Sequence, residues 1–445
     1  MLKKVLIANR GEIALRIIRA CRDLGIKSVV AYSEADRDSL PVALADDKVC
    51  IGPANAQLSY LNTSRLISAA LVKGCDAIHP GYGFLSENGD FAEAVLESGL
   101  VFIGPKPETI RLLGDKVTAR QRMKAAGVPV VPGSDGVIDS VREAVKIARE
   151  IGYPVILKAA AGGGGKGMRV VREEAELETG WNLCQAEAHR SFEDHRLYLE
   201  KYLTDARHIE VQILADAQGN CISLGERDCS AQRRHQKLLE ESPAPGIEPE
   251  LRARLSDWAK SAAIAAGYLN AGTVEFICDR QANCYFIEMN ARLQVEHPVT
   301  ELVTNVDIVA EQLKIASGER LTISENPDWP LGNALECRIY AEDPDNNFQP
   351  SPGMITDLFL PGGPGVRIDT DIYPGYQVSA LYDPLLAKII TWGKDREEAV
   401  RRMERALYET TIAGIATTID FQRRLLSSPR FRRGDLTTTL LDEVW

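Results

Sequence analysis

The chain has 445 residues and a formal net charge of −11, from 52 Lys and Arg against 63 Asp and Glu. This acidic balance argues against a general binder of nucleic acid or of anionic membranes. Hydrophobic residues make up 45% and charged residues 26%, as in globular proteins, and the length suffices for about three domains of roughly 150 residues. The N-terminal apolar run is too short for a signal peptide, and no run approaches the roughly 18 apolar residues of a membrane helix. We therefore expect a cytoplasmic protein without a membrane partner.

The first third of the chain alternates strand-like and helix-like segments. Short apolar runs at 4–8, 28–32, 75–78 and 101–103 predict strands, and helical patterns lie between them, as at 64–73 and 91–98. This βαβ series predicts a doubly wound, largely parallel sheet. No GxGxxG follows the first strand, so a nicotinamide-dependent dehydrogenase loses its main support.

The middle of the chain changes character twice. Residues 115–134 predict a helix and a proline-containing linker, and 135–203 hold a helix, a strand, a Gly-rich loop, a helix and a strand. From residue 207 the pattern alternates strictly, with His208, Glu210 and Gln212 on one face. Residues 272–278 and 285–290 predict an antiparallel hairpin around the turn DRQAN.

The last part, after Pro330, predicts a mixed region with Gly- and Pro-rich turns and a basic amphipathic helix near 397–408. Nine cysteines are scattered through the whole chain without a CxxC pair: Cys21, Cys50, Cys75, Cys184, Cys221, Cys229, Cys278, Cys284 and Cys337. An odd and unpatterned number indicates reduced intracellular thiols, neither a disulfide framework nor a zinc site.

A Gly-rich loop follows the strand that ends at Lys158 and reads AAAGGGGKGM. Consecutive glycines let backbone N–H groups surround an anion, and Lys158 and Lys166 add positive charges suited to phosphate. Gly167 follows Lys166, so the loop is not a Walker A motif, which needs Ser or Thr there. A flexible surface loop is the alternative, but the two lysines favour phosphate binding.

The predicted hairpin carries oxygen ligands inside apolar strands. Strand periodicity puts Glu288 and Asn290 on one face, and Glu275 can face the same way if the register allows. Such ligands suit magnesium bridging nucleotide phosphates. The alternative is a solvated acidic face, which the apolar neighbours TVEFI and YFIEMN disfavour, because an unpaired buried charge is costly.

Two polar segments are weaker signals by themselves. The segment 292–298, RLQVEHP, offers a cation, an amide and a carboxylate that could hold a small oxyanion and supply a general base. A salt-bridged loop explains it equally well. The basic run 232–237 could be a solvated turn, and His208 and His297 alone are more often structural than catalytic.

Taken together, the segments HPGYGFLSEN, GGGGKGM, ERDCSAQRRHQK and FIEMNARLQVEHPVTE resemble the biotin carboxylase family of the ATP-grasp superfamily, from Val5 to about the last ten residues. The resemblance implies an N-terminal doubly wound αβ domain (1–113), an ATP-grasp domain (114–330) with a mobile lid at about 135–203, and a C-terminal mixed α+β domain (331–445). It also implies the reaction. ATP and bicarbonate give carboxyphosphate, and its CO2 passes to the ureido nitrogen of biotin on a carrier.

The resemblance also implies a role for each matching residue. Those implied to bind ATP are Lys116, Lys158, Gly164, Gly165, Glu200, Lys201, Tyr202, Leu203, His208, Gln232 and His235. Magnesium or manganese would be held by Glu275, Glu288 and Asn290, and the bicarbonate pocket would contain Lys237, Arg292, Gln294 and Val295. Glu296 would deprotonate bicarbonate, and Arg338 would stabilise the biotin enolate, with Tyr82 beside biotin.

Partners are implied in the same way. The only Met-Lys pair, Met123-Lys124, is not followed by Met, so we expect biotin on a separate carboxyl carrier protein, with carboxyltransferase subunits completing the enzyme. A homodimer through the surface of Arg19 and Arg367 is expected, although Asp23 and Pro364 differ from some bacterial relatives. The downstream acceptor stays open among acetyl-CoA, other acyl-CoAs, pyruvate and other 2-oxo acids.

Two alternatives keep the phosphate and metal groups but change the outcome. One is an ATP-grasp ligase that forms a carbamate or a peptide, since a fold does not fix a function. Arg338 and the segment RLQVEHP disfavour it, because such a ligase needs no arginine for a biotin enolate. The other is a nucleotide-binding regulatory subunit, which the complete set of charged positions disfavours.

Overall fold

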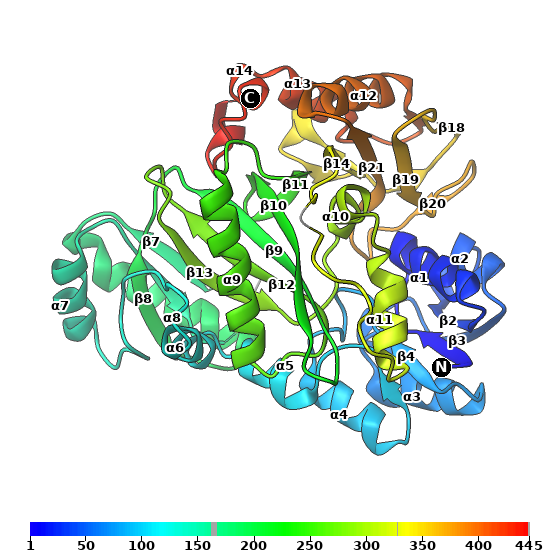
Figure 1. The fold of residues 1–445 in the computed structure, drawn as a ribbon, viewed down its shortest axis with the longest axis horizontal. Helices are drawn as coiled ribbons and strands as arrows, with labels where there is room; N and C mark the ends of the chain where they lie inside the picture. The colour runs from blue at the N-terminus through cyan, green and yellow to red at the C-terminus, as the bar shows by residue number, and fades with distance from the viewer. Residues whose placement is uncertain (162–166, 327, 444–445) are drawn as a thin grey trace.

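A computed structural model describes residues 1–161, 167–326 and 328–443. Figure 1 shows a central sheet, with the N-terminal part at the lower right, the segment 135–203 at the left and the C-terminal part at the top. None of the helices within the described ranges has the length and apolarity needed to cross a membrane. Gly164 and Gly165, which the sequence implies in ATP binding, lie outside the described residues.

The N-terminal part is the predicted parallel sheet. Its order is β3 (Asp47–Gly52), β2 (Lys27–Ser33), β1 (Lys4–Ile7), β4 (Ala77–His79) and β5 (Val101–Phe102), and all four pairings are parallel. Helices α1 (Gly11–Asp23), α2 (Leu40–Leu44), α3 (Thr63–Val72) and α4 (Gly89–Glu97) connect the strands. The apolar strand residues Leu6, Val29 and Ile78 are buried in its core. The expected fold class is confirmed here, with β3 as an additional edge strand.

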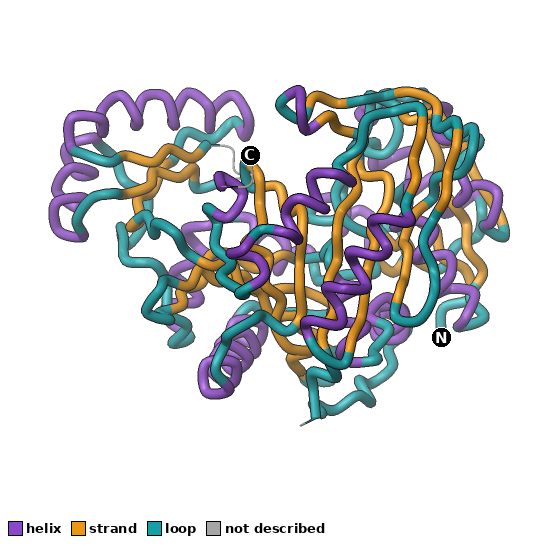
Figure 2. Tube along the Cα trace, turned by 90° about the horizontal axis from the view of Figure 1, so that it is seen from above, coloured by secondary structure: helices purple, strands orange, loops and turns teal. Residues whose placement is uncertain are grey.

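Helices α5 (Pro107–Gly114) and α6 (Lys116–Ala125) lead into the segment 135–203. That segment contains α7 (Val141–Ile151), α8 (Leu177–Phe192) and a three-stranded antiparallel sheet, ordered β7 (Met168–Val171), β6 (Val155–Ala159), β8 (Leu197–Lys201). Within this segment the sequence pattern did not predict strand β7. Ala144, Leu157 and Trp181 lie in a small core of its own. Figure 2 shows this unit to one side of the main sheet.

The central sheet has eight antiparallel strands in the order β13-β12-β9-β10-β11-β14-β21-β19. Their bounds are β9 (Arg207–Ala215), β10 (Cys221–Arg233), β11 (Gln236–Ser242), β12 (Asn270–Cys278), β13 (Cys284–Asn290), β14 (Asn333–Tyr340), β19 (Val366–Thr370) and β21 (Leu385–Gly393). Strand β11 pairs with β14, with Glu240 opposite Glu336. The sheet is therefore continuous across residue 330, where the sequence suggested a domain boundary.

The two faces of this sheet are covered by different helices. Ile209, Val211 and Ile213 belong to the apolar core that includes residues of α9 (Pro249–Ala265), which crosses the sheet in Figure 1. Helix α10 (His297–Thr304) packs against β10, β11, β14 and β21, and its Thr300 bonds Arg227 on the opposite, polar face. Helix α11 (Ile308–Ala316) lies next to α1. The predicted alternation in β9 thus separates an apolar core from a polar site.

The C-terminal part is mixed α+β, as expected. Helices α12 (Arg396–Glu409), α13 (Ile419–Ser427) and α14 (Pro429–Arg432) pack near β14 and β21. Three short pairs complete it: β15 (Glu342–Asp343) with β16 (Gln349–Pro350), β17 (Gly353–Met354) with β20 (Gln377–Val378), and β18 (Asp357–Phe359) with β22 (Thr411–Ala413).

The prediction that every cysteine is a reduced thiol is wrong for one pair. Cys278 and Cys284 form a disulfide next to the turn of the β12–β13 hairpin, with their Cα atoms 4.0 Å apart. The hairpin register places these two residues directly opposite each other. A search for CxxC cannot find such a pair, because the turn and not the sequence spacing brings the two thiols together.

Candidate active site

The polar face of the central sheet collects most of the charged residues that the sequence singled out. Glu210 on β9 is fully buried and accepts a hydrogen bond from Arg227 on β10 at 2.5 Å. Arg227 is fully buried as well, and it also bonds Gln212 at 2.8 Å and Thr300 at 2.9 Å. Sequence reasoning missed Arg227, although an arginine within a buried strand could have drawn attention to it. It ties the sheet to helix α10.

Lys237 on β11 lies among three carboxylates. Its Nζ is 2.6 Å from Glu210, 3.1 Å from Glu275 and 2.6 Å from Glu296. Burial acts to lower the pKa of Lys237, but these three carboxylates outweigh it and raise that pKa well above its ordinary value. Lys237 therefore carries a fixed positive charge at the centre of the site.

Glu296 lies just before helix α10 and is fully buried. One oxygen accepts from Lys237, and the other accepts from Arg338 on β14 at 2.9 Å. Burial would raise the pKa of Glu296, but Lys237, Arg338 and Arg227 hold it well below its usual range. The carboxylate is thus ionised at neutral pH and can accept a proton from an acid placed against it.

Arg338 is held between two carboxylates. Its Nη2 lies 2.9 Å from Glu296 and 2.6 Å from Glu240, which is fully buried on β11. Burial raises the pKa of Glu240 to about 7, against the opposing effect of Arg338. The sequence identified Arg338 but not Glu240, whose position depends on the pairing of β11 with β14.

The segment before Glu296 presents the cation and amide that the sequence suggested. Arg292 Nη1 donates to Gln294 Oε1 at 2.9 Å, and its Nε donates to Glu87 at 2.8 Å. Gln294 donates to Glu275 at 3.3 Å, and the Val295 carbonyl accepts from Lys388 at 2.9 Å. Glu87 and Lys388 come from distant parts of the chain, and sequence reasoning missed both.

The three predicted metal ligands lie at one end of the β12–β13 hairpin. Glu275 is opposite Glu288 in the register, and Asn290 Nδ2 donates to Glu275 at 2.7 Å. Glu288 accepts from Lys116, at the start of α6, at 2.9 Å. Burial would raise the pKa of Glu275, but Lys237 and His208 lower it. The two carboxylates and one amide are hard oxygen donors of the kind that magnesium prefers.

His208 links this cluster to the β10–β11 turn. Its Nε2 lies 2.9 Å from Glu275, and its Nδ1 lies 2.8 Å from the amide nitrogen of Gln232. Burial lowers the pKa of His208, but Glu275 outweighs that effect and raises it. His235 sits in the turn with a positive φ of 68°, and burial together with Lys158 lowers its pKa. His208 thus joins Glu275 on β12 to Gln232 on β10 by direct polar contacts.

The lid unit, residues 135–161 and 167–203 of the described chain, contributes the other predicted nucleotide residues. Lys158 Nζ lies 2.5 Å from Glu200, which also pairs with Arg120 at 3.2 Å. Lys201 donates to the carbonyls of Gly152 and Tyr153, and the Tyr202 N–H donates to Pro154. Leu203 follows and is half-buried.

Tyr82, which the sequence implied beside biotin, donates a short hydrogen bond to Glu12 on α1. Glu12 lies 3.1 Å from Lys388. Tyr82 is thereby connected to the Val295 carbonyl through two buried charged residues.

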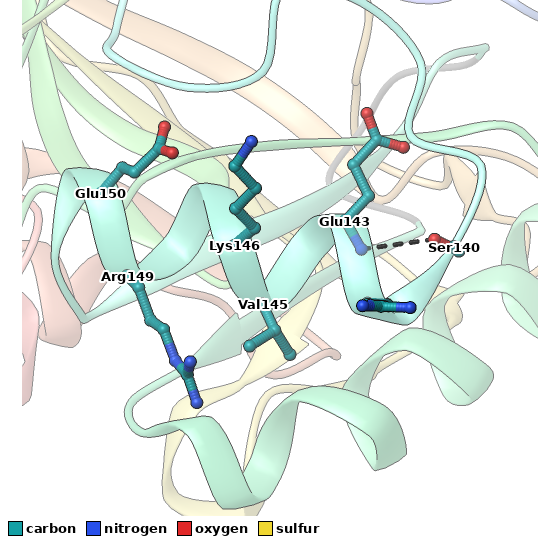
Figure 3. A pocket seen from close by; sticks show the side chains of 7 residues that line it. Ser140, Glu143, Val145, Lys146, Arg149 and Glu150 are labelled. Carbon is teal, nitrogen blue, oxygen red and sulfur yellow. Dashed lines mark hydrogen bonds between the residues drawn. The ribbon is translucent and has the colours of Figure 1, made fainter.

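A hollow on the outer surface of the lid unit is not a second candidate active site. Ser140, Glu143, Val145, Lys146, Arg149 and Glu150 line it, all on or next to α7. Figure 3 shows Arg149 and Val145 pointing away from Lys146 and Glu150, so these side chains do not converge. The dashed contact is the cap of α7, where the Glu143 N–H donates to Ser140.

Comparison with known protein families shows which family has this domain arrangement. Residues 1–110 match the biotin carboxylase N-terminal domain, 115–324 the ATP-binding domain of the carbamoyl-phosphate synthase L chain, and 336–443 the biotin carboxylase C-terminal domain. The chain is 57% identical over 445 residues to a biotin carboxylase of Allochromatium vinosum, covering 100% of this chain and 99% of that one. It is 55% identical over 443 residues to biotin carboxylase 1 of Bacillus subtilis, covering 99% and 98%.

Two solved structures of biotin carboxylases are similar to this chain over nearly its whole length. A crystal structure of a biotin carboxylase–β,γ-ATP complex from Campylobacter jejuni has a TM-score of 0.97 and 49% identity, with 99% of both chains covered. A biotin carboxylase domain dimer of the Hydrogenobacter thermophilus 2-oxoglutarate carboxylase, in complex with MgADP, ADP and bicarbonate, has a TM-score of 0.96 and 49% identity, covering 100% of this chain and 98% of that one.

Proposed function

The chain belongs to the biotin carboxylase family and is an ATP-dependent ligase, and we propose that the residues gathered around Lys237 carry out its reaction. The observation that carries the proposal is the placement of Glu296, a fully buried and ionised carboxylate between Lys237 and Arg338. These full-length relatives also disfavour the two alternatives, a carbamate- or peptide-forming ligase and a regulatory subunit.

The first step we propose is activation of bicarbonate. Arg292, Gln294 and the Val295 backbone lie beside Glu296 and would orient the oxyanion, with Lys237 offsetting its charge. Glu296 takes the proton of bicarbonate, and the resulting carbonate oxygen attacks the γ-phosphorus of ATP. ADP leaves and carboxyphosphate forms. Fixed cations stabilise the negative charge of this transition state without having to reorganise.

The nucleotide would lie between the lid unit and the central sheet. Lys116 and Lys158 would contact its phosphates and Glu200 to Leu203 would contact adenine, and His208 on β9, Gln232 on β10 and His235 in the β10–β11 turn would lie near the nucleotide. Glu275, Glu288 and Asn290 would hold magnesium or manganese, which neutralises phosphate charge when bound. Closure of the lid, which includes Gly164 and Gly165, would protect carboxyphosphate from water.

The second step transfers CO2 to biotin. Carboxyphosphate breaks into CO2 and phosphate. The released phosphate takes the proton of the ureido nitrogen of biotin, and this nitrogen then attacks the CO2. Arg338 would stabilise the negative charge on the ureido oxygen, because a guanidinium stays protonated at neutral pH. Tyr82 would contact biotin from the N-terminal part. Biotin would arrive on a separate carboxyl carrier protein, and carboxyltransferase subunits would use the product.

Two further expectations remain part of the proposal. The domain boundaries at 113/114 and 330/331 are supported by the start of α6 at Lys116 and by the loop before β14, although the pairing of β11 with β14 joins one sheet across the second boundary. A homodimer through α1 and β19 is supported by the exposed Arg19 and by the related 2-oxoglutarate carboxylase domain, whose structure is a dimer, while Arg367 bonds Glu301 and Asp369 of its own chain. A monomeric mass in light scattering at micromolar concentration would count against the dimer.

The test is release of ADP by the purified chain with magnesium and ATP, with and without bicarbonate and free biotin. We expect ADP release to require bicarbonate and to rise with biotin. Glu296→Gln should lower this turnover by about 100-fold or more while ATP still binds. Glu325→Gln, a partly exposed carboxylate paired with Lys260, is the matched control and should behave as the parent. Unchanged turnover of Glu296→Gln would remove the proposed base.

A further inference from the structure

Lys388 is a lysine with no access to solvent at the meeting point of three parts of the molecule. It lies on β21 in the C-terminal part, and its side chain is 0% exposed. Its Nζ donates to the Val295 carbonyl at 2.9 Å and lies 3.1 Å from Glu12 on α1. Asp369 on β19 is 3.8 Å away. One ammonium group therefore touches residues of all three parts.

The contact with Val295 acts on the proposed base. The carbonyl of Val295 and the N–H of Glu296 belong to one planar peptide unit, so holding the oxygen fixes that plane. Lys237 and Arg338 hold the carboxylate of Glu296, whereas Lys388 holds its backbone. A shift of this peptide would displace the base relative to bicarbonate even if both carboxylate contacts survived.

The contact with Glu12 reaches the proposed biotin side. Glu12 Oε1 accepts from the Tyr82 hydroxyl and lies against the same Lys388 nitrogen. The path from Tyr82 to the base thus runs through Glu12, Lys388 and the Val295–Glu296 peptide. Each member is joined to the next by a direct polar contact within the described structure.

Removing the ammonium group of Lys388 from water costs desolvation energy. The charged groups around it offset that cost. The charged groups that face it are Glu12 on α1, Glu336 on β14, and Arg367 and Asp369 on β19, with His297 on α10 nearby. Burial lowers the pKa of Lys388, and the three carboxylates outweigh it and raise that pKa. Apolar side chains of similar size in place of the whole ionic network would remove this desolvation cost, so stability alone does not explain a buried charged network here.

We propose that Lys388 is a positioning residue of the carboxylation reaction, which holds the Val295–Glu296 peptide and the Glu12–Tyr82 pair so that bicarbonate and biotin meet one correctly placed base. The proposal rests on the role of Glu296 given above. Lys388 touches neither substrate, and it acts through Val295 and Glu12.

The first test is Lys388→Met, which keeps the length of the side chain and removes its charge and its hydrogen bonds. We expect the KM for bicarbonate to rise by about tenfold and kcat with biotin to fall, while the KM for ATP changes by less than about twofold. Lys116 and Lys158, the proposed phosphate contacts, bond other residues. Lys394→Met, an exposed lysine just after β21, is the matched control and should match the parent.

A second set of variants separates positioning from charge balance. Glu12→Gln keeps a hydrogen-bonding side chain at Lys388 and Tyr82 but removes one negative charge. In the double variant Lys388→Met with Glu12→Gln, Glu12 no longer leaves an unpaired charge. Positioning predicts that the double variant regains thermal stability yet keeps the bicarbonate defect, and that Glu12→Gln alone changes the bicarbonate KM by less than about threefold.

Three outcomes would overturn the inference. They are an unchanged bicarbonate KM in Lys388→Met, full recovery of bicarbonate KM in the double variant, or a bicarbonate defect in Glu12→Gln as large as that of Lys388→Met. If Lys388→Met does not fold, the other two variants still decide: a parent-like KM for bicarbonate in the double variant, or a rise of more than about threefold in Glu12→Gln alone, would overturn the inference. In contrast, a parent chain without bicarbonate-dependent ADP release would contradict the proposed function itself, so the two failures can be told apart.

Discussion

The charged residues of the central sheet and those of the lid unit are held in different ways. On the sheet, Glu210 and Glu296 are 0% exposed, and Lys237 and the neighbouring arginines contact each of them. On the outer surface of the lid, Arg149 and Glu174 form a single pair whose side chains are 66% and 43% exposed. Water can replace the second kind of contact but not the first.

This difference separates two functions. A buried network cannot relax when one member changes, so it keeps its charges placed for a transition state and is costly to disrupt. Exposed pairs on the lid are screened by water and contribute little, so they would not resist the proposed movement of the unit. The contact between Lys158 on β6 and Glu200 on β8 is intermediate, because it lies within the lid unit but is partly buried.

The largest effect is expected for Lys237→Met, which leaves three carboxylates around an apolar side chain. We expect bicarbonate-dependent ADP release to fall by at least about 100-fold, and the free energy of unfolding to fall by about 3–5 kcal/mol, because buried charges lose their partner. Urea unfolding and the ADP assay measure the two quantities. Lys146→Met on α7, drawn in Figure 3, is the exposed counterpart and should change neither. Similar losses of ADP release and stability in Lys237→Met and Lys146→Met would contradict the difference between the buried network and the lid surface.

Acid should also act on buried groups before exposed ones. Burial lowers the pKa of His79 on β4 to about 3, and its Nδ1 accepts from the Gly81 N–H, so it is neutral in the folded protein. Its pKa is lower when folded than when unfolded, so its contribution is fully present above pH about 6.5 and is lost as the pH falls toward 3. At pH 5 that loss is about 2 kcal/mol.

The measurement compares urea unfolding at pH 8 and pH 5 in parent and variant chains. His79→Gln should reduce the stability difference between the two pH values by about 2 kcal/mol, whatever its stability at pH 8. Asp371, whose pKa burial raises to about 6, titrates in both chains and cancels in the comparison. His189→Gln, on the exposed side of α8, should leave the difference unchanged. An unchanged difference in His79→Gln would contradict the buried neutral state.

A smaller effect is expected where the two regions meet. Lys158→Met should raise the KM for ATP by about tenfold, since a charge-assisted contact to phosphate would be lost. The KM for bicarbonate at saturating ATP should stay within about twofold of the parent, because Lys158 bonds Glu200 and none of the residues around Glu296. If only the KM for bicarbonate changed, Lys158 would belong with the buried network around Glu296 and not with the nucleotide-binding residues of the lid unit. Lys146→Met again serves as the control.

The sequence predicted those parts of the site that depend on local pattern. Alternation placed His208, Glu210 and Gln212 on one face of a strand, and the turn DRQAN predicted the hairpin. The register that sets Glu275 opposite Glu288 was left open by the sequence and is given by the structure. The parallel N-terminal sheet followed in the same way from its βαβ series.

Features that depend on contacts between distant segments were not predictable in this way. Glu240 meets Arg338 only because β11 pairs with β14, and Glu87 reaches Arg292 across 205 positions. In the sequence, Lys388 is a single lysine within an apolar strand. Its contact with the Val295 carbonyl is visible only in the folded structure. The disulfide was missed for a related reason, since the hairpin register and not the spacing joins Cys278 to Cys284.

The smallest effect of a substitution is expected on the outer surface of the lid unit. It tests whether exposed ion pairs of the lid matter less than the buried network of the sheet. Glu174→Gln removes the exposed partner of Arg149. Both side chains remain in water, so the urea midpoint and the KM for ATP should stay within experimental error of the parent. High salt should not alter this result, because screening already weakens the pair. If Glu174→Gln instead changed the KM for ATP as much as Lys158→Met, the outer surface would belong to the working part of the lid. Lid movement would then depend on its surface ion pairs and not only on contacts with the nucleotide.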